Sequence, residues 1–185
     1  MGEIDDAIER ADREAFTKNP PKTLKGQIGY LLKQLGSAKA VAQEIGVTAD
    51  SVNRYRRGAR KHPRADVAAK IDDAVRQRWQ PLVRKRRHKQ AATSGGITVE
   101  TRARFGYTAP IGTTDDGRFR RLTVHLPPVY AQRLFDARDA GASDQQMRGI
   151  IAEGFKEVYF QDGGGRATGL SDVAINDIDY LDLDF

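Results

Sequence analysis

Apolar side chains recur every three or four positions through the N-terminal half of the chain, a spacing that predicts amphipathic helices. Helices are expected at residues 3–16, at 24–34, at 38–57 as two helices joined by a turn, and from Pro63 to about Pro81. Val67, Ile71, Val75 and Trp79 repeat at i,i+4 within the last of these, and Pro81 is expected to kink or end it.

Residues 38–58 have the pattern of a helix-turn-helix. Gly46 supplies the positive φ that a three-residue turn needs, and Thr48 is placed to cap the second helix through its hydroxyl. Val52 and Tyr55 are spaced to bury one side of that helix. Its other side chains are expected to face outward, where they suit base edges and phosphates: Asp50, Ser51, Asn53, Arg54, Arg56 and Arg57.

The pattern changes after the small, polar run 91–96, which is expected to be a linker. Beyond it, alternating residues predict strands at 97–107, 119–126 and 173–185, with two helices between the last two strands. Ser143 and Gln146 are spaced to form a capping box for the second of these helices. We therefore expect a mainly α, N-terminal helix-turn-helix domain with a basic extension over 1–90, followed by a small α+β C-terminal domain over 97–185.

Charge is distributed unevenly along the 185 residues. Residues 1–96 carry 21 Lys and Arg against 11 Asp and Glu, whereas residues 97–185 carry 10 against 14. The densest block, 51–90, has 14 basic and 3 acidic side chains, a distribution typical of polyanion binding. DNA contacts are therefore expected from Ser51, Asn53, Arg54, Arg56, Arg57, Arg60 and Lys61, and on flanking phosphates from the basic extension Arg84, Lys85, Arg86, Arg87 and Lys89, either a further helix or a flexible arm.

Several kinds of site are not expected. The chain has no cysteine, and its three histidines lie far apart in the sequence, so we expect no disulfide and no metal site. The second half has no spacing typical of a catalytic triad, so no catalytic residue is expected. The acidic last strand, with Asp177, Asp179, Asp182 and Asp184, is expected either to be solvated, to dock a basic partner or to shield the basic extension.

The loop between the first two predicted strands presents adjacent hydroxyls, Thr113 and Thr114, between two glycines. Spacing alone assigns this loop no role beyond a hairpin tip. The neighbouring pair Asp115 and Asp116 is interpreted as solvated, because a lone acidic pair in a turn usually is. No apolar run approaches the length of a membrane span and the N-terminus has no apolar signal region, which favours a cytoplasmic location without membrane contact.

The run from Gly96 to Asp116 resembles the terminal proteins (Tpg type) of linear Streptomyces chromosomes and plasmids. The resemblance extends over most of the chain and includes the predicted helix-turn-helix, residues 15–17, 78–81, 134–137 and 178–182. It implies a protein joined covalently to the 5′ ends of a linear replicon, where a threonine hydroxyl primes DNA synthesis. The priming threonine of the family maps to Thr114, with Thr113 as its rival and Thr108 and Tyr107 as weaker candidates.

The resemblance also implies partners: telomeric DNA (the 5′ end, with a single-stranded 3′ overhang or duplex), a telomere-associated protein and a DNA polymerase, at replicon ends in the nucleoid. The chain would then be a substrate and primer rather than an enzyme, with dNTP and Mg²⁺ supplied in the polymerase active site. Gly112, Thr113, Asp115 and Asp116 would face the polymerase, the two carboxylates imitating primer phosphates. The alternative is a helix-turn-helix transcriptional regulator that uses its α+β domain for dimerisation or sensing.

Overall fold

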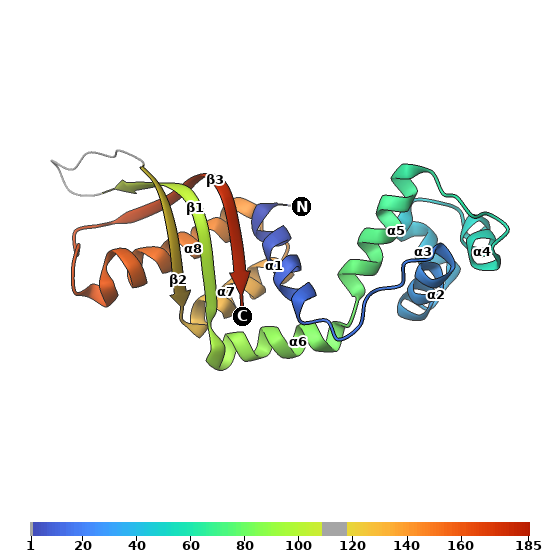
Figure 1. The fold of residues 1–185 in the computed structure, drawn as a ribbon, viewed down its shortest axis with the longest axis horizontal. Coiled ribbons are helices and arrows are strands. Elements are labelled where there is room, and N and C mark those ends of the chain that lie inside the picture. The colour runs from blue at the N-terminus through green and yellow to red at the C-terminus, as the bar shows by residue number, and fades with distance from the viewer. Residues whose placement is uncertain (1, 109–117) are drawn as a thin grey trace. The chain divides into compact units, whose positions relative to one another are not determined.

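The computed structural model describes residues 2–108 and 118–185 (Figure 1). Its contacts divide the chain into two compact units. Unit 1 joins Met1–Ala15 to Leu82–Phe185, and unit 2 is Phe16–Pro81, so unit 2 is inserted into the sequence of unit 1. Helices together with a small antiparallel sheet confirm the coarse form of the predicted fold class.

Unit 2 is helical. It consists of α2 (Leu24–Leu35), α3 (Ala38–Ile45), α4 (Ala49–Arg57) and α5 (Ala65–Arg78). The first three of these helices each begin at a hydroxyl side chain that accepts a backbone N–H, from Thr23, Ser37 and Thr48, and each ends at a left-handed glycine, Gly36, Gly46 and Gly58. Their apolar stripes meet in one core, formed by Ile28, Leu31, Val41, Ala42, Ile45, Val52, Tyr55, Val67, Ile71, Ala74 and Val75.

The two ends of unit 2 lie side by side. The indole Nε1 of Trp79 donates to the carbonyl oxygen of Lys18 over 2.8 Å, and the backbone N–H of Thr17 donates to Gln80 Oε1 over 3.1 Å. Helix α5 ends at Arg78, which confirms the predicted interruption just before Pro81. The chain thus enters and leaves unit 2 at neighbouring points.

Unit 1 is built on an antiparallel sheet of the order β2-β1-β3 among the described strands, β1 (Ile97–Thr108), β2 (Arg118–Leu126) and β3 (Asp172–Asp184). Val99 lies opposite Val124 on one side and Leu183 on the other, and all three point into the core. Figure 1 shows α7 (Pro128–Asp139) and α8 (Asp144–Phe155) behind the sheet and α1 (Glu3–Glu14) beside β3. The predicted capping box of Ser143 and Gln146 is confirmed at the start of α8.

The division into units differs from the predicted one in three places. Residues 82–90, predicted as a basic extension of the helix-turn-helix domain, belong to unit 1. Helix α1 belongs to unit 1, because Ile4 and Ile8 are fully buried in the core beneath the sheet. The predicted linker 91–96 is wrong, because α6 (Pro81–Gln90) continues as a π-helical turn over Ala91–Gly95 that buries Ala91. The small, polar residue types of this run suit a linker, but Ala91 packs in the core of unit 1.

Candidate nucleic-acid interface

Helices α3 and α4 are joined by a tight turn. Gly46 has φ of +70°, a left-handed conformation that favours glycine, and its N–H caps the last turn of α3 at the carbonyl of Ala42. The hydroxyl of Thr48 accepts the backbone N–H of Ser51 over 3.2 Å and so begins α4. The predicted turn and cap are both present.

Helix α4 has a buried side and an exposed side. Val52 and Tyr55 are buried against the core of unit 2, as predicted. Asp50, Arg54, Arg56 and Arg57 are exposed, and Ser51 and Asn53 are half-buried. Arg60 and Lys61, just beyond the helix, are also exposed. The structure therefore brings together every DNA-contact candidate of this segment on or next to one short helix.

Local contacts hold several of these side chains. Arg54 Nε lies 2.8 Å from Asp50 Oδ2, and Arg57 Nε donates to the carbonyl oxygen of Asn53 over 3.3 Å. The guanidinium of Arg60 lies 5.7 Å from the ring centroid of Tyr55, within reach of a cation–π contact. The outer surface of α4 is therefore cationic and partly ordered before any ligand binds.

The basic extension does not form one such surface. Arg84 is buried in unit 1, where it donates to both carboxylate oxygens of Glu9 over 2.6 and 2.8 Å and to Asp12 over 3.2 Å. A guanidinium that is desolvated and bonded to two carboxylates has no edge left for a phosphate. The prediction that Arg84 binds a flanking phosphate is wrong.

Arg87 is also engaged within unit 1. It donates to the carbonyl oxygens of Ala11 and Phe185, and it lies 3.5 Å from a carboxylate oxygen of Asp184. The extension is a helix, α6, rather than a flexible arm. Its exposed cations are Lys85, Arg86 and Lys89, which stay candidates for phosphate contact.

An ionic network ties α1, α6 and α7 together. Arg138 on α7 donates to Asp5 and to Glu9, over 2.6 Å each, and His88 Nε2 lies 3.0 Å from Asp12 Oδ1. Burial raises the pKa of the Glu9 carboxyl, but hydrogen bonds from Arg84 and Arg138 outweigh it and leave the pKa lowered.

Sequence reasoning missed this network, although a signal was present. Asp5, Glu9 and Asp12 recur at helical spacing in the otherwise basic N-terminal half, and Arg84 and His88 recur at helical spacing in α6. Two helices with opposite charge at matching spacing are a candidate pair even when about 70 residues separate them.

The acidic strand β3 pairs with arginines of its own unit. Its ion pairs join Asp177 to Arg104, Asp179 to Arg102, Asp182 to Arg10 and Asp184 to Arg87, over 2.5–3.5 Å. These pairs lie at the surface, where each contributes little to stability. They connect β3 to β1, α1 and α6.

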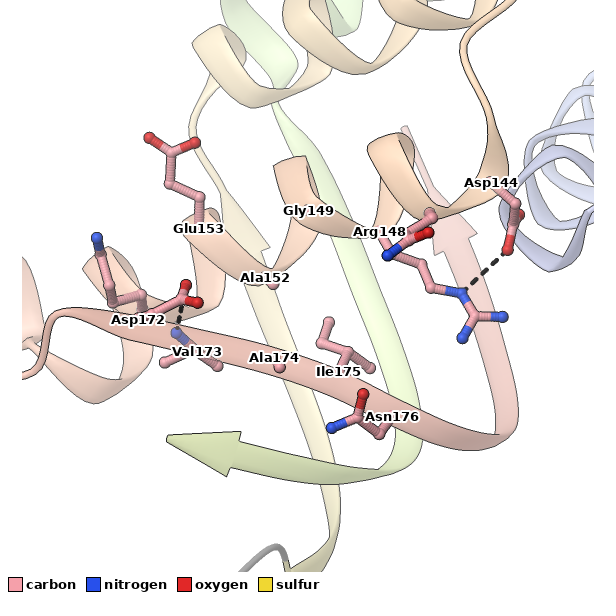
Figure 2. A pocket seen from close by; sticks show the side chains of 12 residues that line it. Asp144, Arg148, Gly149, Ala152, Glu153, Asp172, Val173, Ala174, Ile175 and Asn176 are labelled. Carbon is pink, nitrogen blue, oxygen red and sulfur yellow. Dashed lines mark hydrogen bonds and ion pairs between the residues drawn. The ribbon is translucent and has the colours of Figure 1, made fainter. Parts of the chain in front are cut away.

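A groove of about 740 Å³ lies between α8 and the first half of β3 (Figure 2). In Figure 2 its charged side chains pair locally: Arg148 Nε lies 3.0 Å from Asp144 Oδ2, and Asp172 accepts the N–H of Val173 over 2.9 Å. The lining mixes both signs of charge and contains no nucleophile–base pair.

Among residues 2–108 and 118–185, no group of three His, Asp or Glu is placed to hold a metal ion.

The loop candidates Gly112, Thr113, Thr114, Asp115 and Asp116 lie outside the described residues. Tyr107 and Thr108 belong to the end of β1. Because Phe105 of β1 lies opposite Arg118 of β2, residues 109–117 connect two adjacent antiparallel strands.

The net charge separates sharply between the two units. Unit 2 carries 14 basic and 5 acidic residues, and unit 1 carries 17 basic and 20 acidic residues.

Within the part of the chain that the structure describes, no helix has both the length and the apolar character that crossing a membrane requires. No protein family, curated protein or solved structure is found to match the chain.

Proposed function

We propose that unit 2 binds duplex DNA through a helix-turn-helix formed by α3 and α4. The observation that carries this proposal is the exposed side of α4, where arginines follow a capped helix start and a glycine turn. A helix of this kind fits the major groove with its N-terminal residues toward base edges. The excess of basic residues in unit 2 supports the same conclusion, because phosphate neutralisation supplies most non-specific affinity.

The complete chain is proposed to be a terminal protein of a linear replicon, on the resemblance of residues 96–116 to that family. In this role the Thr114 hydroxyl oxygen attacks the α-phosphorus of a dNTP. A phosphodiester forms, pyrophosphate leaves and the hydroxyl proton is lost. The nucleotide then carries the 3′ hydroxyl from which a polymerase extends the strand.

The place of Thr114 in the chain is compatible with this chemistry. A primer hydroxyl must enter the cleft of a polymerase, and Thr114 belongs to the segment that connects β1 to β2 in sequence. The polymerase supplies two metal ions, which lower the hydroxyl pKa and neutralise the leaving pyrophosphate. Unit 2 would hold the protein at telomeric DNA, near a telomere-associated protein, while unit 1 presents the loop. The chain is accordingly a substrate rather than an enzyme.

Covalent nucleotidylation tests the proposal. The full chain is incubated with a replicative DNA polymerase, telomeric DNA, Mg²⁺ and α-³²P-labelled dNTPs, and then resolved on a denaturing gel. We expect a labelled band that Thr114→Ala removes and Thr113→Ala keeps, with both variants binding DNA like the wild type. Label retained by Thr114→Ala and lost by Thr113→Ala would move the site to the rival threonine.

A helix-turn-helix regulator gives a different result in the same experiment. A regulator takes up no covalent nucleotide and binds a palindromic duplex as a dimer, because operator symmetry mirrors protein symmetry. Absence of label together with dimeric binding to a palindrome would replace the terminal-protein proposal with that alternative.

A further inference from the structure

The three arginines of α4 are held in different ways. Arg54 Nε lies 2.8 Å from Asp50 Oδ2, whereas Arg57 Nε donates to the backbone oxygen of Asn53 over 3.3 Å. Arg56 makes no hydrogen bond or ion pair with any residue that the structure describes. Of the three, Arg54 is thus the one whose guanidinium is positioned by a carboxylate.

The position of this ion pair leaves one edge of the guanidinium available. Asp50 approaches at Nε, the nitrogen nearest the helix, so the two terminal Nη amino groups remain for a ligand. The side chains of Arg54 and Asp50 are 61% and 63% exposed, so the pair lies at the surface rather than in the core. Asp50 precedes Arg54 by four residues and shares its face of α4, opposite the buried Val52.

The chemistry of a positioned guanidinium favours one base. Two parallel N–H groups match the N7 and O6 acceptors of guanine in the major groove. Holding Arg54 in one geometry before binding lowers the side-chain entropy that binding must overcome. The Asp50 carboxylate also repels phosphate oxygens, which disfavours a backbone contact for Arg54 and favours a base contact.

We infer that Arg54, oriented by Asp50, is a specificity-determining residue that reads a guanine in duplex DNA. The inference rests on the proposed DNA binding by α4 and names the base that this helix selects. Arg56 and Arg57, which lack a carboxylate partner in the described structure, then act mainly on phosphates.

Selection from a duplex pool tests the inference. The full chain and its Arg54→Lys variant are each used to select from 30-base-pair duplexes with a randomised centre. We expect the wild type to enrich a guanine that Arg54→Lys no longer enriches, because one ammonium cannot form two parallel hydrogen bonds. On the selected duplex, replacing that guanine by 7-deazaguanine should weaken wild-type binding by roughly 5- to 100-fold and the variant far less.

Two further variants separate orientation from charge. Asp50→Asn keeps Arg54 but removes the carboxylate, so guanine preference should fall severalfold while binding to unrelated duplex is equal or tighter. Arg76→Lys is the matched control, since Arg76 forms an i,i+4 pair with Asp72 over 2.9 Å on α5, and it should keep the full preference. Thermal unfolding of all variants checks that each is folded.

The outcomes are distinguishable. If the wild type selects a sequence and Arg54→Lys keeps the same guanine preference, duplex recognition stands and the role of Arg54 is overturned. If the wild type selects no sequence, both the role of Arg54 and sequence reading by α4 are overturned. An equal loss of guanine preference in Arg76→Lys and Arg54→Lys would also overturn the role of Arg54, because the loss would then not be specific to α4.

Discussion

Helices α4 and α6 are both short and rich in arginine, and their sequences predict the same use for it. In the structure the arginines of α4 are exposed, whereas Arg84 of α6 is buried against Glu9 and Asp12 and Arg87 is bonded to backbone oxygens. Local charge density is the same kind of signal in both helices. The difference arises from what each helix meets in three dimensions.

Carboxylates elsewhere in the chain decide whether a cation is free. Helix α6 packs beside α1, which brings a line of acidic side chains to it. Among the residues that the structure describes, the carboxylate paired with an exposed arginine of α4 is that of Asp50, on the same helix. A basic segment is therefore a candidate binding surface only after acidic helices of matching spacing have been considered.

The largest effect is expected from Arg84→Ala. The variant leaves Glu9 and Asp12 buried without their main partner, which should cost about 3–5 kcal/mol of folding free energy. Urea unfolding followed by far-UV circular dichroism should show unit 1 melting at lower urea. Fluorescence of Trp79, the one tryptophan of the chain, reports unit 2 separately and should change little.

Arg54→Ala is the matched control for this measurement. It removes an exposed arginine from an i,i+4 pair, and its stability should stay within about 1 kcal/mol of the wild type. Equal destabilisation by Arg54→Ala and Arg84→Ala would contradict the distinction between the two helices.

The second effect concerns DNA. Replacing Arg54, Arg56 and Arg57 together by Gln should weaken duplex binding about 10- to 100-fold at 0.15 M salt. It should reduce the slope of log K against log salt by about 1.8, because Arg56 and Arg57 are expected on phosphates and Arg54 on a base. Replacing the exposed α6 cations Lys85, Arg86 and Lys89 by Gln should weaken binding less than the α4 variant does, because they are expected only at the flanks of the site and on no base. Fluorescence anisotropy across a salt series measures both, and a larger loss from the α6 variant would reverse the assignment.

The third effect is a pH dependence. Because the pKa of Glu9 is lowered in the folded protein from 4.5, its contribution is present above pH 4.5 and is lost as the pH falls through the folded value. Glu9→Gln should therefore destabilise unit 1 by about 1–3 kcal/mol at pH 7, with a difference from the wild type that narrows below pH 4.5. Urea midpoints of both proteins at pH 7 and below pH 4.5 measure this difference in stability. A difference that stays constant with pH would exclude Glu9 as the titrating group.

Periodicity and capping residues predicted the local structure well. The starts of α4 and α8 follow from Thr48 and Ser143, and β2 follows from the alternation of its side chains. These features depend on neighbours within a few residues, which the sequence displays directly. The turn at Gly46 was predictable for the same reason.

Pairings between distant segments were not predictable from the same signals. Burial of Arg84 depends on Glu9, 75 residues away, and the assignment of α1 to unit 1 depends on Ile4 and Ile8 meeting the sheet. The spacing of the acidic side chains marks α1 as a candidate partner for a basic helix but does not say which helix, and the apolar spacing of Ile4 and Ile8 does not say which core they join. The role of Thr114 rests on resemblance, and residues 109–117 lie outside the described structure.

The smallest effect is expected from Asp179→Asn. Asp179 pairs with Arg102 over 2.5 Å, a distance as short as any in the Arg84 network, but both side chains are about half exposed. Solvent screens this pair and replaces its hydrogen bonds, so the variant should lose less than about 1 kcal/mol at pH 7. Glu9→Gln makes the same carboxyl-to-amide change at a buried carboxylate that two arginines hold, so urea unfolding of the two variants compares a buried with an exposed arginine pairing. A loss from Asp179→Asn as large as that from Glu9→Gln would mean that distance, rather than burial, sets the strength of an arginine pair in this protein.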